Sequence, residues 1–153
     1  MNGRQYHNLV WVPIFLVGLI ALAVGITYFT IGEPWLLDKK ANELLLTVSF
    51  KDLLSKGINS ELHLYLSLLY RFFGLWLGSV GFLIVLYVLV TKMGTALARN
   101  SLHSALLFVV AGIYYVEFSF IPTTPFIWLT HIITFLLIVS IYGSIKIKKY
   151  DNL

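Results

Sequence analysis

The sequence predicts an all-α membrane protein, with four transmembrane helices in an antiparallel bundle and an interfacial helical segment between the first two. Two uncharged runs carry this prediction, Asn8 to Gly32 and Phe72 to Thr91, because about 20 apolar residues suffice to cross a bilayer. Composition agrees: 59% of the 153 residues are hydrophobic and 12% are charged, against about 25% charged in soluble domains. We therefore expect a single membrane domain over residues 1–153.

The first helix is expected over residues 9–32. Ala21-Leu22-Ala23 resembles a signal-peptidase site, but the apolar run continues to Ile31, whereas a cleaved signal should lose its hydrophobicity there. Small residues also recur at helical spacing along this run, which favours close approach of another membrane helix. They are Gly18, Ala21, Gly25 and Gly32. An uncleaved membrane helix is the better interpretation.

Residues 33–61 form the main polar segment, which is expected to lie outside the cytoplasm. Pro34 suits a first helical turn and Gly57 a helix stop, and leucines between them give an apolar side. One or two short helices at the interface or over the bundle are predicted. Ser60 and Glu61 then read as the N-cap and acidic first turn of the second membrane helix, residues 62–91.

The remaining apolar sequence divides into helices at 101–121 and 125–147. Asn100-Ser101 is typical of a helix start, and Thr124 is placed to cap a helix whose first residue is Pro125. This division places Glu117 and His131 inside membrane helices. Charged and ionisable groups inside the membrane are costly and therefore point to pairing or function.

Basic residues predict the orientation. With both termini cytoplasmic, six Lys and Arg lie inside and four outside, a moderate positive-inside bias. The inside set is Arg4, Lys92, Arg99, Lys146, Lys148 and Lys149, and the outside set is Lys39, Lys40, Lys51 and Lys56. We expect an integral protein of a bacterial or archaeal plasma membrane, with the lipid bilayer as its first partner and His7 and His103 near water or headgroups at the cytoplasmic boundary.

Three ionisable residues fall at one depth, roughly 6–9 Å outward of the membrane midplane at about 1.5 Å per residue. They are Arg71, Glu117 and His131. We expect Arg71 and Glu117 to face each other inside the bundle, either as a structural pair that fixes helix register or as part of a ligand or proton site; snorkelling to the interface is a third interpretation.

The default expectation for His131 is a neutral imidazole that is hydrogen-bonded within the core, with Tyr114, Tyr115 or Tyr70 as its partner. Trp76 and Tyr114 are also expected deep enough to line an apolar pocket or simply to pack. The candidate ligand-binding residues are Arg71, Glu117, His131, Tyr114 and Trp76.

No catalytic motif accompanies these residues. The chain has no cysteine, which excludes disulfides, thiolate metal sites and Cys nucleophiles, and it lacks HExxH, GxSxG, P-loop and dinucleotide fingerprints. His63 and His131 differ too much in expected depth to be axial haem ligands. We predict no catalytic residue, no metal and no nucleic-acid partner, and leave cofactors open.

The run Tyr70-Arg71-Phe72-Phe73-Gly74-Leu75-Trp76-Leu77-Gly78 resembles the small four-helix DoxX-like bacterial membrane proteins and related families of unknown function. Arg71, Gly74 and Gly78 carry the likeness. It implies a subunit or helper in membrane redox and quinone chemistry. A fainter likeness, through Arg71 to Trp76, is to four-helix eukaryotic scaffold proteins of the sterol pathway.

Two hypotheses of different classes follow. The first is a non-enzymatic protein that binds a lipid-like or quinone-like amphiphile, or a membrane protein partner, at the level of Arg71, Glu117 and His131. The second is a membrane redox or transfer enzyme subunit in which Glu117 and His131 handle protons. A haem or flavin absorption band would favour the second.

Overall fold

Four long helices make up most of the chain in this computed structural model, which describes residues 3–55 and 57–151. Each is long and apolar enough to cross a membrane, and the described residues contain no strand, so the predicted all-α bundle is confirmed. The long helices are α1 (Gly3–Thr30), α4 (Leu62–Thr91), α5 (Ala96–Phe120) and α6 (Phe126–Asp151). Between α1 and α4 lie η1 (Pro34–Asp38), α2 (Lys39–Leu46), α3 (Phe50–Ser55) and η2 (Gly57–Asn59).

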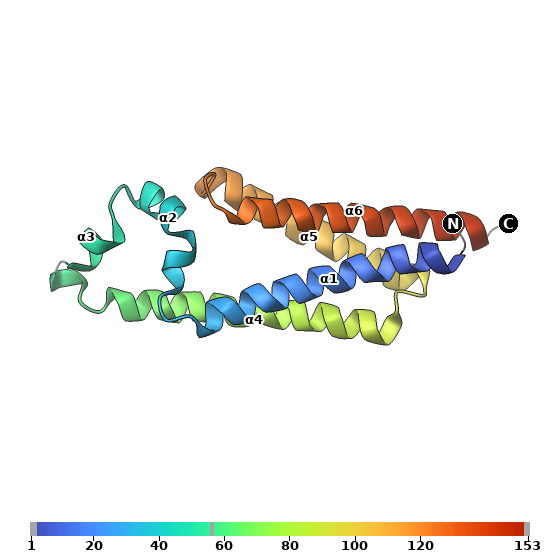
Figure 1. The fold of residues 1–153 in the computed structure, drawn as a ribbon, viewed down its shortest axis with the longest axis horizontal. Coiled ribbons are helices and arrows are strands. Elements are labelled where there is room, and N and C mark those ends of the chain that lie inside the picture. The colour runs from blue at the N-terminus through green and yellow to red at the C-terminus, as the bar shows by residue number, and fades with distance from the viewer. Residues whose placement is uncertain (1–2, 56, 152–153) are drawn as a thin grey trace.

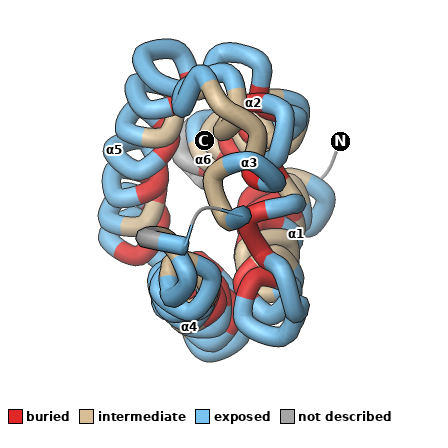
Figure 2. Tube along the Cα trace, turned by 90° about the vertical axis from the view of Figure 1, so that its left-hand side faces the viewer, coloured by how far each residue is buried: buried red, intermediate tan, exposed pale blue. Residues whose placement is uncertain are grey.

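The bundle has two different ends (Figure 1). Both chain termini lie at one end, which we call the terminal end. The short helices of residues 31–61 lie at the other, the loop end, together with the turn between α5 and α6. Helix α1 packs against both α4 and α6, whereas α5 packs mainly against α6. Helix α5 begins beside α4, where the Tyr87 hydroxyl donates to the Ala98 carbonyl (3.1 Å), and diverges from α4 toward the loop end (Figure 1 and Figure 2).

Helices α1 and α4 touch through their backbones. An added Cβ on Gly25 would lie 2.2 Å from the amide nitrogen of Gly78, and one on Gly81 would lie 2.3 Å from that of Leu22. Only glycine allows this approach, which is a common basis of helix association in membranes. The predicted small-residue stripe is confirmed at Gly18 and Gly25, but a Cβ added at Gly32, beyond the end of α1 at Thr30, would meet nothing within 4 Å.

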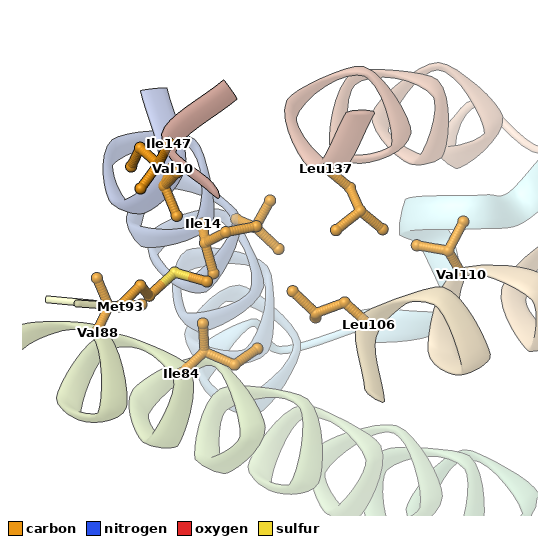
Figure 3. Packing of buried hydrophobic residues seen from close by; sticks show 10 residues of the cluster. Val10, Ile14, Ile84, Val88, Met93, Leu106, Val110, Leu137 and Ile147 are labelled. Atoms are coloured by element: carbon orange, nitrogen blue, oxygen red, sulfur yellow. The ribbon is translucent and has the colours of Figure 1, made fainter. Parts of the chain in front are cut away.

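Apolar side chains from all four long helices meet in one core (Figure 3). Its centre is formed by Val10 and Ile14 of α1 with Val88 of α4 and Leu137 of α6. In a bilayer this packing acts through close contact rather than through the hydrophobic effect, since lipid tails are as apolar as the side chains.

The bounds of α4 agree with the predicted 62–91, but those of α5 do not agree with 101–121. The backbone of Lys92 and Met93 is left-handed, with φ of 47° and 51°, and this tight turn ends α4. Thr95 then caps α5 by accepting a hydrogen bond from the Ala98 amide (3.1 Å), so Asn100-Ser101 is not the start.

At the remaining helix ends the predictions were partly right. Helix α1 spans Gly3–Thr30 rather than 9–32, and α6 spans Phe126–Asp151 rather than 125–147. The predicted cap of α6 is confirmed, since the Thr124 hydroxyl accepts from the Phe126 amide (3.2 Å). The N-cap of α4 is Glu61 rather than Ser60, and its side chain makes no capping hydrogen bond.

Residues 31–61 partly cover the loop end. Trp35, Ala41 and Phe50 are buried, while Leu44 and Leu45 on α2 are exposed. An exposed apolar side beside charged lysines suits the membrane interface, in agreement with the predicted interfacial segment.

Candidate functional site

The five predicted site residues are divided between two faces of the bundle. Arg71 and Trp76 lie on α4 and are exposed, and Trp76, 59% exposed, packs edge-to-face with Phe72 of the same helix (6.0 Å between centroids). Glu117, Tyr114 and His131 lie on α5 and α6. Trp76 therefore does not share a pocket with Tyr114.

The expected Arg71–Glu117 pair is wrong. Within residues 3–55 and 57–151 the sole ion pair is Lys39–Glu43 (3.9 Å). The reason lies in the rotation of α4: Tyr70 and Phe73 contact Tyr28, which also contacts Phe126 of α6. Arg71 instead shares a face with Leu75, one turn on, and so points away from α6.

Glu117 is deeply buried between α5 and α6, with 4% of its surface exposed. Its Oε1 accepts a hydrogen bond from the Thr130 hydroxyl (2.7 Å). Its Oε2 is buried and has no hydrogen-bond partner. An unsatisfied carboxyl oxygen in an apolar interior is costly, so Thr130 is important for the stability of this helix pair.

Tyr114 contacts His131, and it is one of the three tyrosines that the sequence offered as partners. The Tyr114 hydroxyl lies 2.7 Å from Nδ1 of His131 and 3.1 Å from Oγ1 of Thr134. Thr134 donates its hydroxyl proton to the Thr130 carbonyl oxygen (2.7 Å). His131 is nevertheless exposed on the outside of the bundle.

When each of these three contacts is a hydrogen bond, one residue of each pair must supply the proton, and the donors can be assigned in turn. Because Thr134 donates to a carbonyl, its oxygen must accept from Tyr114, and Tyr114 must then accept from Nδ1–H of His131. The network thus assigns the proton of neutral His131 to Nδ1, which leaves Nε2 as an acceptor.

Aromatic rings surround His131. Phe118 stacks on Tyr114 (5.7 Å between centroids, 9° between planes), and Trp128 meets His131 edge-on (5.9 Å, 88°). Both rings are largely exposed. We call Tyr114, Phe118, Trp128 and His131 the aromatic face. His131 lies roughly 8 Å from the middle of the apolar span Phe126–Ile147.

A second polar cluster, at the loop end, escaped the sequence analysis. Asp38 of η1 is 7% exposed, and its Oδ2 accepts from the Thr124 hydroxyl (3.0 Å) while Oδ1 is buried without a partner. Burial raises the pKa of Asp38, and the Thr124 hydrogen bond opposes that shift. Nearby, Asn42 donates to the Tyr70 hydroxyl (3.0 Å) and Tyr70 stacks on Tyr28.

A third cluster joins the helices at the terminal end. His103 is buried rather than facing water or headgroups: its Nε2 lies 2.7 Å from the Ser140 hydroxyl, which donates to the Val10 carbonyl (2.6 Å). Arg99 is also buried, and its guanidinium donates to Ser144 and to the carbonyls of Met93 and Gly94.

The spacing of α5 carried a signal for the buried groups. Arg99, His103, Leu106, Val110 and Glu117 fall on one helical stripe, and all five are buried. An earlier helix start, at Ala96, places Arg99 inside that stripe. By contrast, no sequence pattern distinguishes Asp38 from the other acidic residues of residues 33–61.

No group of three or more His, Asp or Glu residues that could hold a metal occurs in the part of the chain that the structure describes. No family model, curated protein or solved structure matches this chain. The resemblance to DoxX-like proteins therefore stays a prediction.

Proposed function

We propose that this membrane protein is a non-enzymatic binder of a ring-headed, quinol-like amphiphile, which lies in the bilayer against the aromatic face. The observation that carries the proposal is His131, an exposed histidine within an apolar span, with Nδ1 engaged by Tyr114. A polar group that faces lipid is costly and points to function. Here its free Nε2 accepts a hydrogen bond from a hydroxyl of the ligand.

The surrounding rings support a flat headgroup. Trp128 lies beside His131, Phe118 stacks on Tyr114, and both present exposed ring surface, against which an aromatic ring packs in offset or edge-on geometry. The apolar tail then lies along α5 or α6 among the lipid chains. A membrane protein partner, as an accessory subunit would have, is the other occupant that this face fits.

The alternative, a redox or transfer enzyme subunit, needs a path for protons between His131 and Glu117. The hydrogen-bond chain from His131 ends at the backbone carbonyl of Thr130, whereas Glu117 accepts from the Thr130 side chain. A carbonyl oxygen does not pass a proton on to a hydroxyl, so the contacts favour binding over proton transfer. An absorption spectrum of the purified protein separates the two, since a haem or flavin band would support the enzyme subunit.

A binding titration tests the proposal. We expect a short-chain benzoquinol to quench tryptophan fluorescence of the detergent-solubilised protein, with about fivefold weaker binding for its dimethyl ether, which lacks hydroxyl donors. His131→Phe should weaken quinol binding by a similar factor and leave ether binding unchanged. Trp76→Phe, on the other face, is the matched control and should bind like the wild type. Equal affinity for quinol and ether would refute the role of Nε2.

The proposed orientation places both termini in the cytoplasm of a bacterial or archaeal cell. Because the chain has no cysteine, single cysteines report cleanly on sidedness. Lys51 and Asn100 are exposed at opposite ends; a cysteine at Lys51 should react with an impermeant maleimide in intact cells and one at Asn100 should not. The reverse pattern would invert the orientation.

A further inference from the structure

Arg71 is a residue that the proposed function leaves unexplained. It is exposed and makes no hydrogen bond or ion pair within the described residues. It lies roughly 8 Å from the middle of α4, and its neighbours Phe72, Phe73 and Leu75 are exposed apolar residues. An unpaired arginine facing hydrocarbon is costly, so an anionic partner is expected.

An open groove begins at Gly74 and Leu75, one helical turn after Arg71. It follows the α1–α4 seam, has a volume of about 280 Å³, and is walled by Leu22, Ile26 and Phe29 of α1 and Leu75, Ser79 and Phe82 of α4. Its floor includes Gly25, Gly74 and Gly78, where the absence of side chains leaves room. Arg71 precedes Gly74 by three residues and Leu75 by four, so it shares their face of α4.

We infer that the groove and Arg71 together hold one phospholipid, with its phosphate on the guanidinium and one acyl chain in the groove. The direction agrees with a lipid in a leaflet. Side chains on a helix tilt toward its N-terminus, which here is the loop end, so the guanidinium reaches toward the headgroups. The groove runs the opposite way, toward the middle of the membrane.

The depth of the groove suits an acyl chain. Arg71 and Phe82 lie roughly 8 Å on either side of the middle of α4, so the groove passes through the middle of the membrane, where lipid chains and no headgroups lie. A guanidinium is the side chain best suited to a phosphate because it donates two hydrogen bonds in a fixed plane. This lipid site lies on the side of α4 that faces away from α6, and it does not depend on the proposed function of the aromatic face.

Native mass spectrometry of the protein in an uncharged detergent tests this inference. The probes are dioleoylphosphatidylglycerol and dioleoylglycerol, which share their chains and differ in the phosphate. We expect the wild type to retain one molecule of the phospholipid, with about tenfold weaker retention of dioleoylglycerol. Equal retention of the two probes would overturn the inference.

Two kinds of variant distinguish the contribution of the lipid headgroup to retention from that of the acyl chain. Arg71→Leu should remove the preference for the phospholipid, whereas Ser79→Phe, which fills the groove and keeps Arg71, should lower retention of both probes. Val80→Phe adds the same ring to an exposed residue on the opposite face of α4, outside the groove lining, and should retain lipid like the wild type. Should Arg71→Leu fail to fold, Ser79→Phe and Val80→Phe decide the question. Unchanged retention by Ser79→Phe, or equal loss in Val80→Phe, would refute the site.

Discussion

The α1–α4 pair and the α5–α6 pair hold together by different physical means. Along α1–α4 the backbones touch at Gly25 and Gly78, and around these glycines the described residues make no side-chain hydrogen bond between the two helices. Side-chain hydrogen bonds join α5 and α6: Thr130 donates to Glu117, Arg99 donates to Ser144, and Tyr114–His131 and His103–Ser140 form two further bonds. Polar side chains between neighbouring helices therefore accumulate where close backbone packing is absent.

Adding a side chain where the backbones of α1 and α4 touch should give the largest effect on stability. A Cβ on Gly25 would lie 2.2 Å from the backbone nitrogen of Gly78, which cannot yield without moving a helix, so Gly25→Ala should lower the free energy of unfolding by about 3 kcal/mol. Gly112→Ala is the control: it adds the same methyl group where nothing lies within 4 Å and should be neutral or stabilising by about 0.5 kcal/mol. Denaturation in mixed detergent measures both. Equal losses would show that backbone contact does not hold the seam.

Removing one hydroxyl from the interface between α5 and α6 should have a smaller effect on stability. Thr130→Val keeps the shape of the side chain but takes the donor from Glu117 Oε1, so neither oxygen of that buried carboxyl then has a hydrogen-bond partner. We expect a loss of about 1–3 kcal/mol in the same denaturation assay.

Thr27→Val is the matched control for that substitution. The Thr27 hydroxyl donates only to the Ala23 carbonyl within its own helix (2.9 Å), so its loss should change stability by less than about 0.5 kcal/mol. A Thr130→Val protein as stable as Thr27→Val would show that the Glu117 contact contributes little and that the two helix pairs differ less than their contacts indicate.

The two pairs also differ in how well the sequence predicts them. The uncharged runs were enough to locate α1 and α4, and the glycines at helical spacing were enough to predict the face of α1 that another helix approaches, because close approach needs a specific residue type. Side-chain partners across α5 and α6 depend on helix rotation, which hydropathy does not reveal. Tyr114–His131 was among the predicted partners, but Arg71–Glu117 was wrong, since equal depth places two residues at one level without placing them on facing sides.

Asp38 was missed for a related reason. It is one of five acids in residues 33–63, and its burial results from the docking of η1 on the turn before α6 through Thr124. That is a long-range contact with no local signature. The stripe from Arg99 to Glu117, by contrast, was visible in the sequence, and an earlier start of α5 would have predicted that both residues are buried.

The smallest effect is expected from titration of Asp38, which lies at the loop end and belongs to neither helix pair. Its pKa in the folded protein is raised, first by burial, so between its ordinary value near 3.9 and the raised value the folded state binds more protons than the unfolded state. Stability should therefore fall as pH rises through that window and stay lower above it.

The surroundings of Asp38 give no other source for this dependence. Around it lie Thr124 and the phenols of Tyr28 and Tyr70, whose ordinary pKa near 10 is far from the window, and the neighbouring Lys39 pairs with Glu43. Asp38→Asn should abolish the dependence and keep the contact with Thr124, because an amide oxygen also accepts a hydrogen bond. Melting temperatures of both proteins from pH 4 to pH 8 measure this. A parallel decline in the Asp38→Asn protein would assign the titration to another group, and a flat profile in the wild type would mean that the Asp38 carboxylate is stabilised at the loop end in spite of its burial.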